Sequence, residues 1–300
     1  MERILTHNWQ LRLLSQIRRG SWFLEPSVAE SSLSIIDGLF SKDASFIPVA
    51  DTIQIKAQAE GASEVALSDT TQEDVVCIIP IRGTLLKYGT LCSYGADEYA
   101  AMMDYARLHP KVQGVVLDID SGGGEAAAVP VLIQAVRRLQ QSGKPVVASV
   151  DFCGSAAYWL ASACDRIYAN NAEVAQIGSI GAMVVLIDDR KATEEAGYKR
   201  IYVFAPQSSD KNRAYLDALD DRPEALKENL LRPLAQAFIE GVKTNRAGKL
   251  KEDTPGLLSG AVFFAEAAEA AGLIDGVRTR EEAIQIARDL SEINSFTQKQ

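Results

Sequence analysis

Short apolar runs alternate with helix-like segments from Val75 onward, and this alternation limits the possible folds more than any other feature. A strand with one solvent-exposed face has polar residues at every second position, and these runs do not. Their continuous apolar sequence is typical of strands that are buried on both faces. Strands that alternate with helices predict an α/β domain with largely parallel strands. The predicted strands are Val75–Ile81, Val112–Ile119, Pro145–Val150, Arg166–Ala169 and Lys199–Phe204. The predicted helices are Asp97–Leu108, Ala127–Gln141, Ser155–Cys164, Glu224–Asn245 and Phe263–Ala271.

The first 74 residues have a different pattern from the rest of the chain. Ser27–Glu30 is a capping-box sequence, and apolar residues follow it at helical spacing. Residues 41–74 are rich in Ser, Ala, Asp and Glu and show little periodicity. We therefore expect a helical arm and a mobile linker over residues 1–74, the main domain over residues 75–285, and a tail over residues 286–300.

Charge and hydropathy exclude several classes of partner. The net charge of −9 argues against nucleic acid or an anionic membrane as the main partner. Residues 1–19 contain no apolar core of signal-peptide length, and no stretch of about 18 apolar residues occurs, so no membrane anchor is expected. These features predict a cytoplasmic protein.

Cysteine and histidine usage argues against a metal site. None of the four cysteines forms a CxxC pair, and the chain has only two histidines, His7 and His109. The cysteines lie among apolar or small residues, which predicts reduced, buried thiols. A zinc site is disfavoured, and we expect no metal and no organic cofactor.

A run of three glycines follows the second predicted strand directly, in Asp120–Gly124. Consecutive glycines allow unusual dihedral angles and let another backbone approach closely. Their N–H groups can also face a developing negative charge. Taken alone, the same run favours a plain turn between a strand and a helix.

Ser155 lies at the start of a predicted helix, in the sequence Cys153–Trp159. Its neighbours are small, which leaves the hydroxyl accessible, and a helix N-terminus provides N–H groups that stabilise an oxyanion. These features suit a nucleophile. A serine that merely caps the helix would give the same local pattern.

A nucleophilic serine needs a base, and neither histidine is an obvious partner for Ser155. A Ser–Lys pair remains possible. The lysines that follow Ser155 are Lys191, Lys199, Lys211, Lys227, Lys243, Lys249, Lys251 and Lys299. Physical reasoning alone does not select one of them.

The order of these motifs resembles the signal peptide peptidase A (protease IV) family of serine peptidases. The resemblance runs from about Val76 to Val277. Asp118–Gly124 is similar to the family's glycine strand, and Gly154–Trp159 to its nucleophile segment. Further matching segments are Ala161–Ala169, Gly178–Gly181 and the Gly-Leu-Ile-Asp sequence that ends at Asp275.

The family's base element resembles Gln207–Asn212 and would place the general base at Lys211. The same resemblance implies Ser155 as nucleophile and an oxyanion hole formed by Gly123, Gly124 and Ala156. Some positions depart from the family pattern. Gly122 stands in place of a proline, Ala156 and Ala157 replace two glycines, and Gln207, Ser208 and Asn212 differ within the base element.

The resemblance implies a ClpP/crotonase-like α/β fold, built as a repeated β-β-α superhelix with the helical N-terminal arm added. It also implies a protein or peptide substrate bound in extended conformation, and a homo-oligomer with enclosed sites. With no expected anchor and with the Ser-Ala-Ala-Tyr-Trp segment, the chain resembles the phage and prophage branch of the family. That branch implies capsid or scaffold proteins as partners, and a location in the host cytoplasm or the assembling particle. Two alternatives stay open: an inactive assembly scaffold, and a crotonase-type acyl-CoA enzyme with Glu125 as its acid/base.

Overall fold

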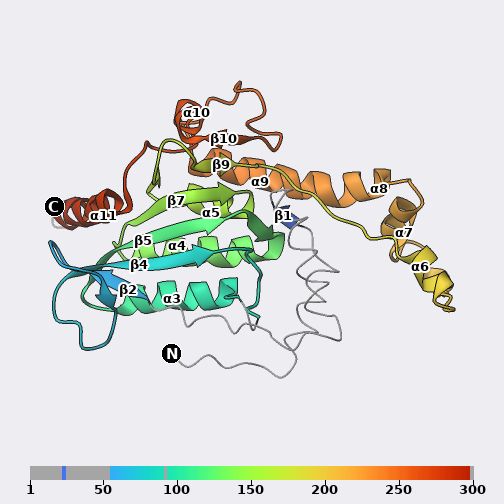
Figure 1. Cartoon of the computed structure of the whole chain (residues 1–300), viewed down its shortest axis with the longest axis horizontal. Coiled ribbons are helices and arrows are strands. Elements are labelled where there is room, and N and C mark those ends of the chain that lie inside the picture. The colour runs from blue at the N-terminus through green and yellow to red at the C-terminus, as the bar shows by residue number, and fades with distance from the viewer. Residues whose placement is uncertain (1–21, 25–54, 91–92, 298–300) are drawn as a thin grey trace.

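The computed structural model describes residues 22–24, 55–90 and 93–297 (Figure 1). Strands and helices alternate through the body of the chain, as predicted. The strands are β1 (Trp22–Leu24), β2 (Lys56–Gln58), β3 (Val65–Ala66), β4 (Val75–Arg82), β5 (Val112–Ser121), β6 (Gly123–Glu125), β7 (Val146–Gly154), β8 (Arg166–Ala169), β9 (Gln176–Gly178) and β10 (Val262–Phe264). The helices are α3 (Ala96–Leu108), α4 (Val129–Gln141), α5 (Ala156–Ser162), α6 (Arg190–Glu195), α7 (Arg213–Leu219), α8 (Glu224–Leu226), α9 (Arg232–Asn245), α10 (Ala265–Ala270) and α11 (Arg280–Thr297). Shorter helical turns are η1 (Ala126–Ala128), η2 (Pro206–Ser208) and the π-helical η3 (Lys227–Leu231).

Eight strands of the described residues form one sheet, in the order β10-β9-β7-β5-β4-β2-β3, and β8 also pairs with β7. The central pairs β4–β5 and β5–β7 are parallel. One edge of β7 is shared, since β8 pairs with Val147–Val150 and β9 with Phe152–Gly154. The α/β class predicted from the sequence is confirmed. The shared edge keeps β7 paired up to Gly154, and a single residue separates Gly154 from the start of α5.

Helices cover both faces of the central sheet (Figure 1). On one face, Leu117 and Ile119 of β5 belong to the large core that includes residues of α3, α4 and α5. On the other face, Val116 of β5 packs in a second cluster with Ile284 and Ala287 of α11. Because neighbouring residues of a strand point to opposite faces, a strand covered on both sides must be apolar throughout. This explains the uninterrupted apolar runs of the sequence.

The predicted strand Lys199–Phe204 is wrong. These residues form no strand, and the side chains of Ile201 and Val203 are 75% and 86% exposed. The β-branched and aromatic residues favour a strand locally, but strand propensity has an effect only where a neighbouring strand is available. No strand of the described residues pairs with this segment.

Both predicted domain boundaries need correction. The linker was expected to reach residue 74, but β2 and β3 lie within it and β2 pairs with β4, with Lys56 opposite Ile78. The C-terminal tail was expected from residue 286, but α11 crosses that point. The short strands β2 and β3 and the amphipathic helix α11 have weak sequence patterns. The longer polar stretches beside them therefore led to the wrong boundaries. The expected N-terminal helices lie outside the described residues.

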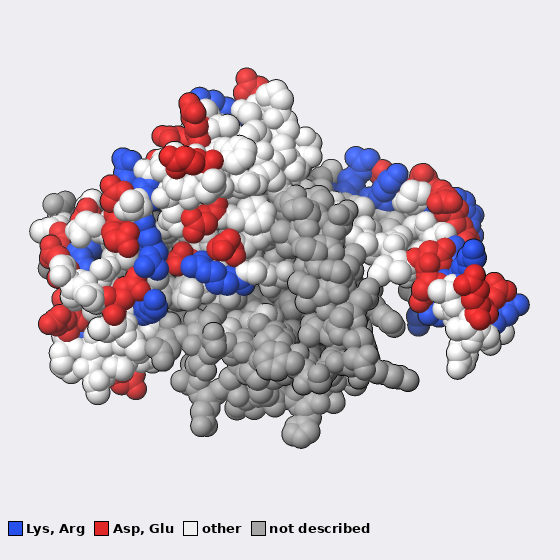
Figure 2. All heavy atoms as spheres, in the orientation of Figure 1, with Lys and Arg blue, Asp and Glu red and all other residues white. Residues whose placement is uncertain are grey.

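Residues 183–226, which include α6, η2, α7 and α8, extend away from the sheet (Figure 1). We call this segment the outlying lobe. Nearly all of its residues are exposed or partly exposed. Acidic and basic side chains are interspersed on it (Figure 2) and pair with one another, as Arg190 does with Asp188 and Asp220. Exposed ion pairs stabilise a fold by only about 0–1 kcal/mol each, so the lobe has little to hold it except its own local structure.

Candidate active site

Ser155 is the single residue between β7 and α5. Its backbone has φ 51° and ψ −117°, a region that residues with a Cβ rarely adopt. Its N–H donates a hydrogen bond to the carbonyl of Gly178 at 2.8 Å. Such strain costs about 1–3 kcal/mol and tends to occur at functional sites. A serine on a sharp turn from strand to helix is also the arrangement that exposes the nucleophile of many hydrolases.

The side chain of Ser155 is not a helix cap. It makes no capping hydrogen bond to α5, and the described residues provide no other partner for its Oγ. The thiol of Cys153 is a second nucleophilic group nearby, and burial raises its pKa, so that it stays protonated. Ser155 is therefore the better candidate nucleophile at this turn.

The glycine segment Gly122–Gly124 lies beside the end of β7. Ser121 of β5 pairs with Cys153 of β7, and a Cβ on Gly154 would come 3.2 Å from the carbonyl oxygen of Gly122. A side chain at Gly154 would therefore crowd the backbone of Gly122. The parallel pairing of β5 with β7 therefore brings together two motifs that are about 30 residues apart in the sequence.

Two of these glycines are required for different reasons. Gly123 has φ 103°, which a side chain would strain. Gly124 faces the backbone of Leu85, and a Cβ there would lie 2.0 Å from the Leu85 carbonyl oxygen. Leu85 donates its N–H to Gly123 O at 2.8 Å and accepts from the N–H of Glu125 at 2.7 Å. One edge of β6 is thus fixed against Leu85.

The three predicted oxyanion donors are not equivalent. The N–H of Gly123 donates to Ser121 Oγ at 3.2 Å, so this donor already has an acceptor. The N–H of Gly124 points to the edge opposite Leu85, because successive N–H groups of a strand alternate in direction. Ala156 is the first residue of α5, where N–H groups have no acceptor within the helix. Gly124 and Ala156 are the better placed pair.

Ser121 is a candidate that sequence reasoning missed. Its buried Oγ donates to the carbonyl of Gly83 at 2.5 Å and accepts from the N–H of Gly123. It therefore ties the glycine segment to the end of β4. The only signal in the sequence was a serine placed directly before the glycines.

Lys211 is not brought to Ser155 within one chain. It lies between η2 and α7 in the outlying lobe, which extends away from the body that contains α5 (Figure 1). Its backbone N–H closes a local turn by donating to Ser208 O at 3.1 Å. The described hydrogen bonds and ion pairs include none between Lys211 and Ser155.

Glu125, the candidate for acyl-CoA chemistry, is engaged elsewhere. Its Oε2 accepts the backbone N–H of Lys87 at 2.9 Å. The carboxylate thus supports the turn after β4. This contact leaves the acyl-CoA alternative without an observation in its favour.

A comparison with protein-family models matches residues 138–294 to the model described as "Peptidase family S49", which is more than half of the chain. The chain belongs to peptidase family S49. This assignment agrees with the resemblance to signal peptide peptidase A, and the observed sheet agrees with the α/β class that the resemblance implies. The S49 match contains both Ser155 and Lys211.

Curated relatives of this S49 chain include cellular and phage proteins. Protease 4 of Haemophilus influenzae is 26% identical over 220 residues, which is 72% of this chain and 34% of the relative. The head-tail preconnector protein GP5 of Enterobacteria phage P21 is 29% identical, over 70% of this chain and 42% of the relative. Capsid assembly protease C of Escherichia phage lambda is 27% identical, over 71% of this chain and 49% of the relative. The chain spans a third to a half of the length of these relatives.

Similar solved structures include a mutant of the membrane-bound stomatin-specific protease 1510-N in complex with a substrate peptide. It has a TM-score of 0.38 and 18% identity, and the match covers 71% of this chain and 79% of that one. An enoyl-CoA hydratase from Shewanella pealeana has a TM-score of 0.41 and 11% identity, with coverage of 75% and 76%. In this S49 chain, none of the helices within the described ranges is long and apolar enough to span a membrane.

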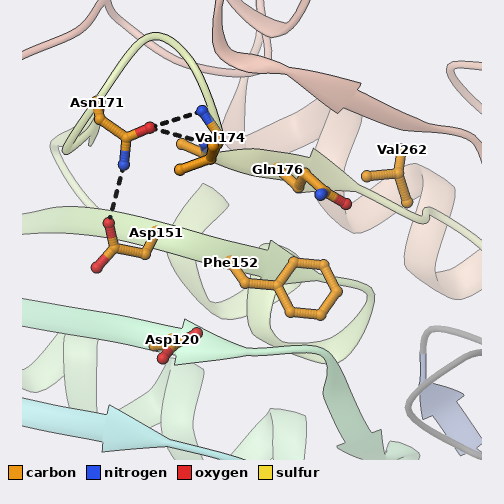
Figure 3. A pocket seen from close by; sticks show the side chains of 8 residues that line it. Asp120, Asp151, Phe152, Asn171, Val174, Gln176 and Val262 are labelled. Atoms are coloured by element: carbon orange, nitrogen blue, oxygen red, sulfur yellow. Dashed lines mark hydrogen bonds between the residues drawn. The ribbon is translucent and has the colours of Figure 1, made fainter.

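The S49 domain also contains a cavity of about 460 Å³ (Figure 3). Asp151 lines it and accepts a hydrogen bond from Asn171 Nδ2 at 3.3 Å. Asp120 of β5 also lines it, and the next residue, Ser121, supports the glycine segment.

Proposed function

We propose that this chain is a serine endopeptidase with Ser155 as nucleophile and Lys211 as general base. The observation that carries the proposal is the strained backbone of Ser155, held at the start of α5 beside the glycine segment. Membership of peptidase family S49 supports the reaction class. The substrate is a protein segment in extended conformation, paired with the backbone of β6.

The proposed chemistry proceeds through an acyl-enzyme. The neutral amine of Lys211 accepts the hydroxyl proton as Ser155 Oγ forms a bond to the scissile carbonyl carbon. The N–H groups of Gly124 and Ala156 stabilise the oxyanion. The C–N bond then breaks, Lys211 returns the proton to the leaving amine, and water hydrolyses the ester. No metal or organic cofactor takes part.

A second copy of the chain would supply Lys211. The lobe that carries Lys211 extends away from its own α5, and its acidic and basic side chains largely pair with each other. Its exposed large apolar residues are Val185, Ile187, Tyr198, Ile201, Tyr202, Val203 and Tyr215. An apolar surface of this kind favours contact with another subunit, and a head-to-tail ring would complete each site with a neighbour's lysine.

Phage relatives support a role in capsid assembly or head maturation. The names of two of them refer to a preconnector protein and to a capsid assembly protease. We propose that the chain cleaves capsid or scaffold proteins in the host cytoplasm or the assembling particle. A substrate presented within an assembly would reach a site that is enclosed by neighbouring subunits.

A fluorophosphonate probe tests the proposal. We expect the probe to modify the full chain at Ser155 alone, and mass spectrometry of the digested protein locates the adduct. Ser155→Ala should remain unmodified while keeping the fold. Lys211→Arg should also fail to react, because a guanidinium stays protonated. A folded, oligomeric chain that stays unmodified after prolonged incubation, both as wild type and as a variant that frees the glycine segment, would indicate an inactive assembly scaffold instead.

A further inference from the structure

Strand β1 occupies the second edge of the glycine strand. Trp22, Phe23 and Leu24 pair antiparallel with Glu125, Gly124 and Gly123, in that order (Figure 1). About 100 residues of chain separate the two strands. Because the contact is a backbone ladder, it does not depend on side-chain chemistry.

The direction of the Gly124 backbone groups shows what β1 covers. Gly123 O and the N–H of Glu125 both bond to Leu85. The N–H and C=O of Gly124 therefore point to the opposite edge, where β1 places Phe23 directly across from it. This is the edge that the proposed reaction assigns to the substrate and to one oxyanion donor.

The surroundings of Ser155 agree with an occupied site. β1 contacts α5 as well as β6, so it lies against the helix that Ser155 precedes. Ser155 is 1% exposed, and Gly123 and Gly124 are buried. A nucleophile that must meet a protein substrate is thus closed to solvent in the full chain.

We propose that residues 22–24 are an internal occupant of the peptide-binding edge and hold the full chain in an autoinhibited state. The occupant is an extended antiparallel strand, which is the conformation expected of the substrate. The chain becomes active when β1 leaves β6, and a substrate strand then pairs with Gly124 in its place. This inference rests on the proposed function, because it assigns a regulator to the same site.

Two proline variants of the full chain test the inference. Phe23→Pro removes the N–H that faces Gly124, whereas Trp22→Pro removes an N–H that points away from β6, at the first residue of the strand. Hydrogen exchange measured by mass spectrometry follows the amides of residues 122–125, and the rate of fluorophosphonate labelling follows access to Ser155. Exchange in β5 and β7 serves as the control for folding.

We expect Phe23→Pro to raise both the exchange of residues 122–125 and the labelling rate by about tenfold, the factor that corresponds to one backbone hydrogen bond. Trp22→Pro should match wild type in both. Unchanged exchange in Phe23→Pro, or an equal rise in both variants, would overturn the pairing. Faster exchange with unchanged labelling would overturn the autoinhibition. Faster exchange of residues 122–125 in Phe23→Pro, with no labelling of any variant, would instead overturn the proposed peptidase function. The pairing of β1 with β6 would then still stand.

Discussion

The N–H of Ser155 donates to the carbonyl of Gly178 at 2.8 Å, and this bond holds Ser155 at a positive φ of 51°. The contact joins the end of β7 to β9, where Gly154 pairs with Gly178. The strain at Ser155 is thus maintained by the sheet itself. A residue without a Cβ would adopt the same backbone at no steric cost.

Replacing Ser155 should separate activity from stability. Ser155→Ala and Ser155→Gly should both lose peptidase activity by several orders of magnitude, because no other nucleophile is positioned. Ser155→Gly should unfold at a higher urea concentration than Ser155→Ala, with a free energy of unfolding about 1 kcal/mol larger, since glycine relieves the strain. If alanine were the more stable of the two, the strain at this position would be refuted.

Two inactive variants should restore activity when they are mixed. Ser155→Ala and Lys211→Ala should each be inactive alone. Dissociating and reassembling an equal mixture should recover about a quarter of wild-type activity, because random assembly pairs an intact serine with an intact neighbouring lysine at one site in four. The release of a fluorogenic peptide product measures the recovery.

Lys191→Ala is the matched control for that mixture. Lys191 lies in the same lobe with a side chain that is 90% exposed, and its substitution should leave activity unchanged. An inactive Lys191→Ala beside an active Lys211→Ala would move the base to Lys191. Loss of activity in Lys211→Ala without recovery in the mixture would argue against a base supplied by a second copy.

Ser121→Ala should impair catalysis through the glycine segment. The substitution leaves the N–H of Gly123 and the carbonyl of Gly83 without their buried partner, which costs about 1–3 kcal/mol of stability. We expect kcat to fall about tenfold with little change in KM, because a misplaced Gly124 N–H weakens transition-state contacts more than substrate binding.

Ser149→Ala provides the comparison for Ser121→Ala. Ser149 is also buried, lies in the neighbouring strand β7 and bonds to Asn170. Its loss should lower stability by a similar amount and leave kcat unchanged. Equal effects of both substitutions on kcat would reduce Ser121 to a structural residue.

Asp275 should make the fold sensitive to acid. Its carboxylate bonds to the buried Arg246 at 2.9 Å, to Lys249 at 2.6 Å and to the N–H of Ile167 at 2.8 Å. Burial raises the pKa of Asp275, but the bonds to Arg246 and Lys249 outweigh it and hold the pKa below its ordinary value. A lowered folded pKa adds stability above the unfolded value of about 3.9, and this stability is lost as pH falls through the folded pKa.

Asp275→Asn should therefore cost about 2–3 kcal/mol near neutral pH and less at pH 3, because it leaves the buried Arg246 without a charge partner. Urea unfolding at both pH values measures the difference. Lys249→Ala removes the 41% exposed partner and should cost under about 1 kcal/mol. A penalty for Asp275→Asn that does not shrink in acid would contradict this role.

The central sheet could be predicted from the sequence because its strands are buried on both faces. Val112–Ile119 is apolar almost throughout for this reason, and it became β5. The Ser155 turn was also predictable, since small residues and glycines mark it locally. Lys199–Phe204 was misassigned because strand propensity alone cannot show that a pairing strand is missing.

Contacts between distant segments were not predictable from local patterns. The pairing of Phe23 with Gly124 joins β1 to a glycine strand far along the chain, and the sequence around β1 does not indicate that partner. The position of Lys211 depends on how the outlying lobe extends from the body, and no periodicity of the sequence encodes that direction. The motif resemblance indicated a lysine as the base, at Lys211, but it did not indicate how far Lys211 lies from Ser155.

The cover that α11 provides has a consequence for synthesis on the ribosome. β4, β5 and β7 carry Val76, Ile78, Val116 and Val147 on the face that α11 covers among the described residues. Since α11 begins at Arg280, this face stays bare until the residues of α11 have been translated and have left the exit tunnel. The nascent domain therefore passes through a stage with an open apolar surface, at which chaperones or premature self-association compete with correct folding.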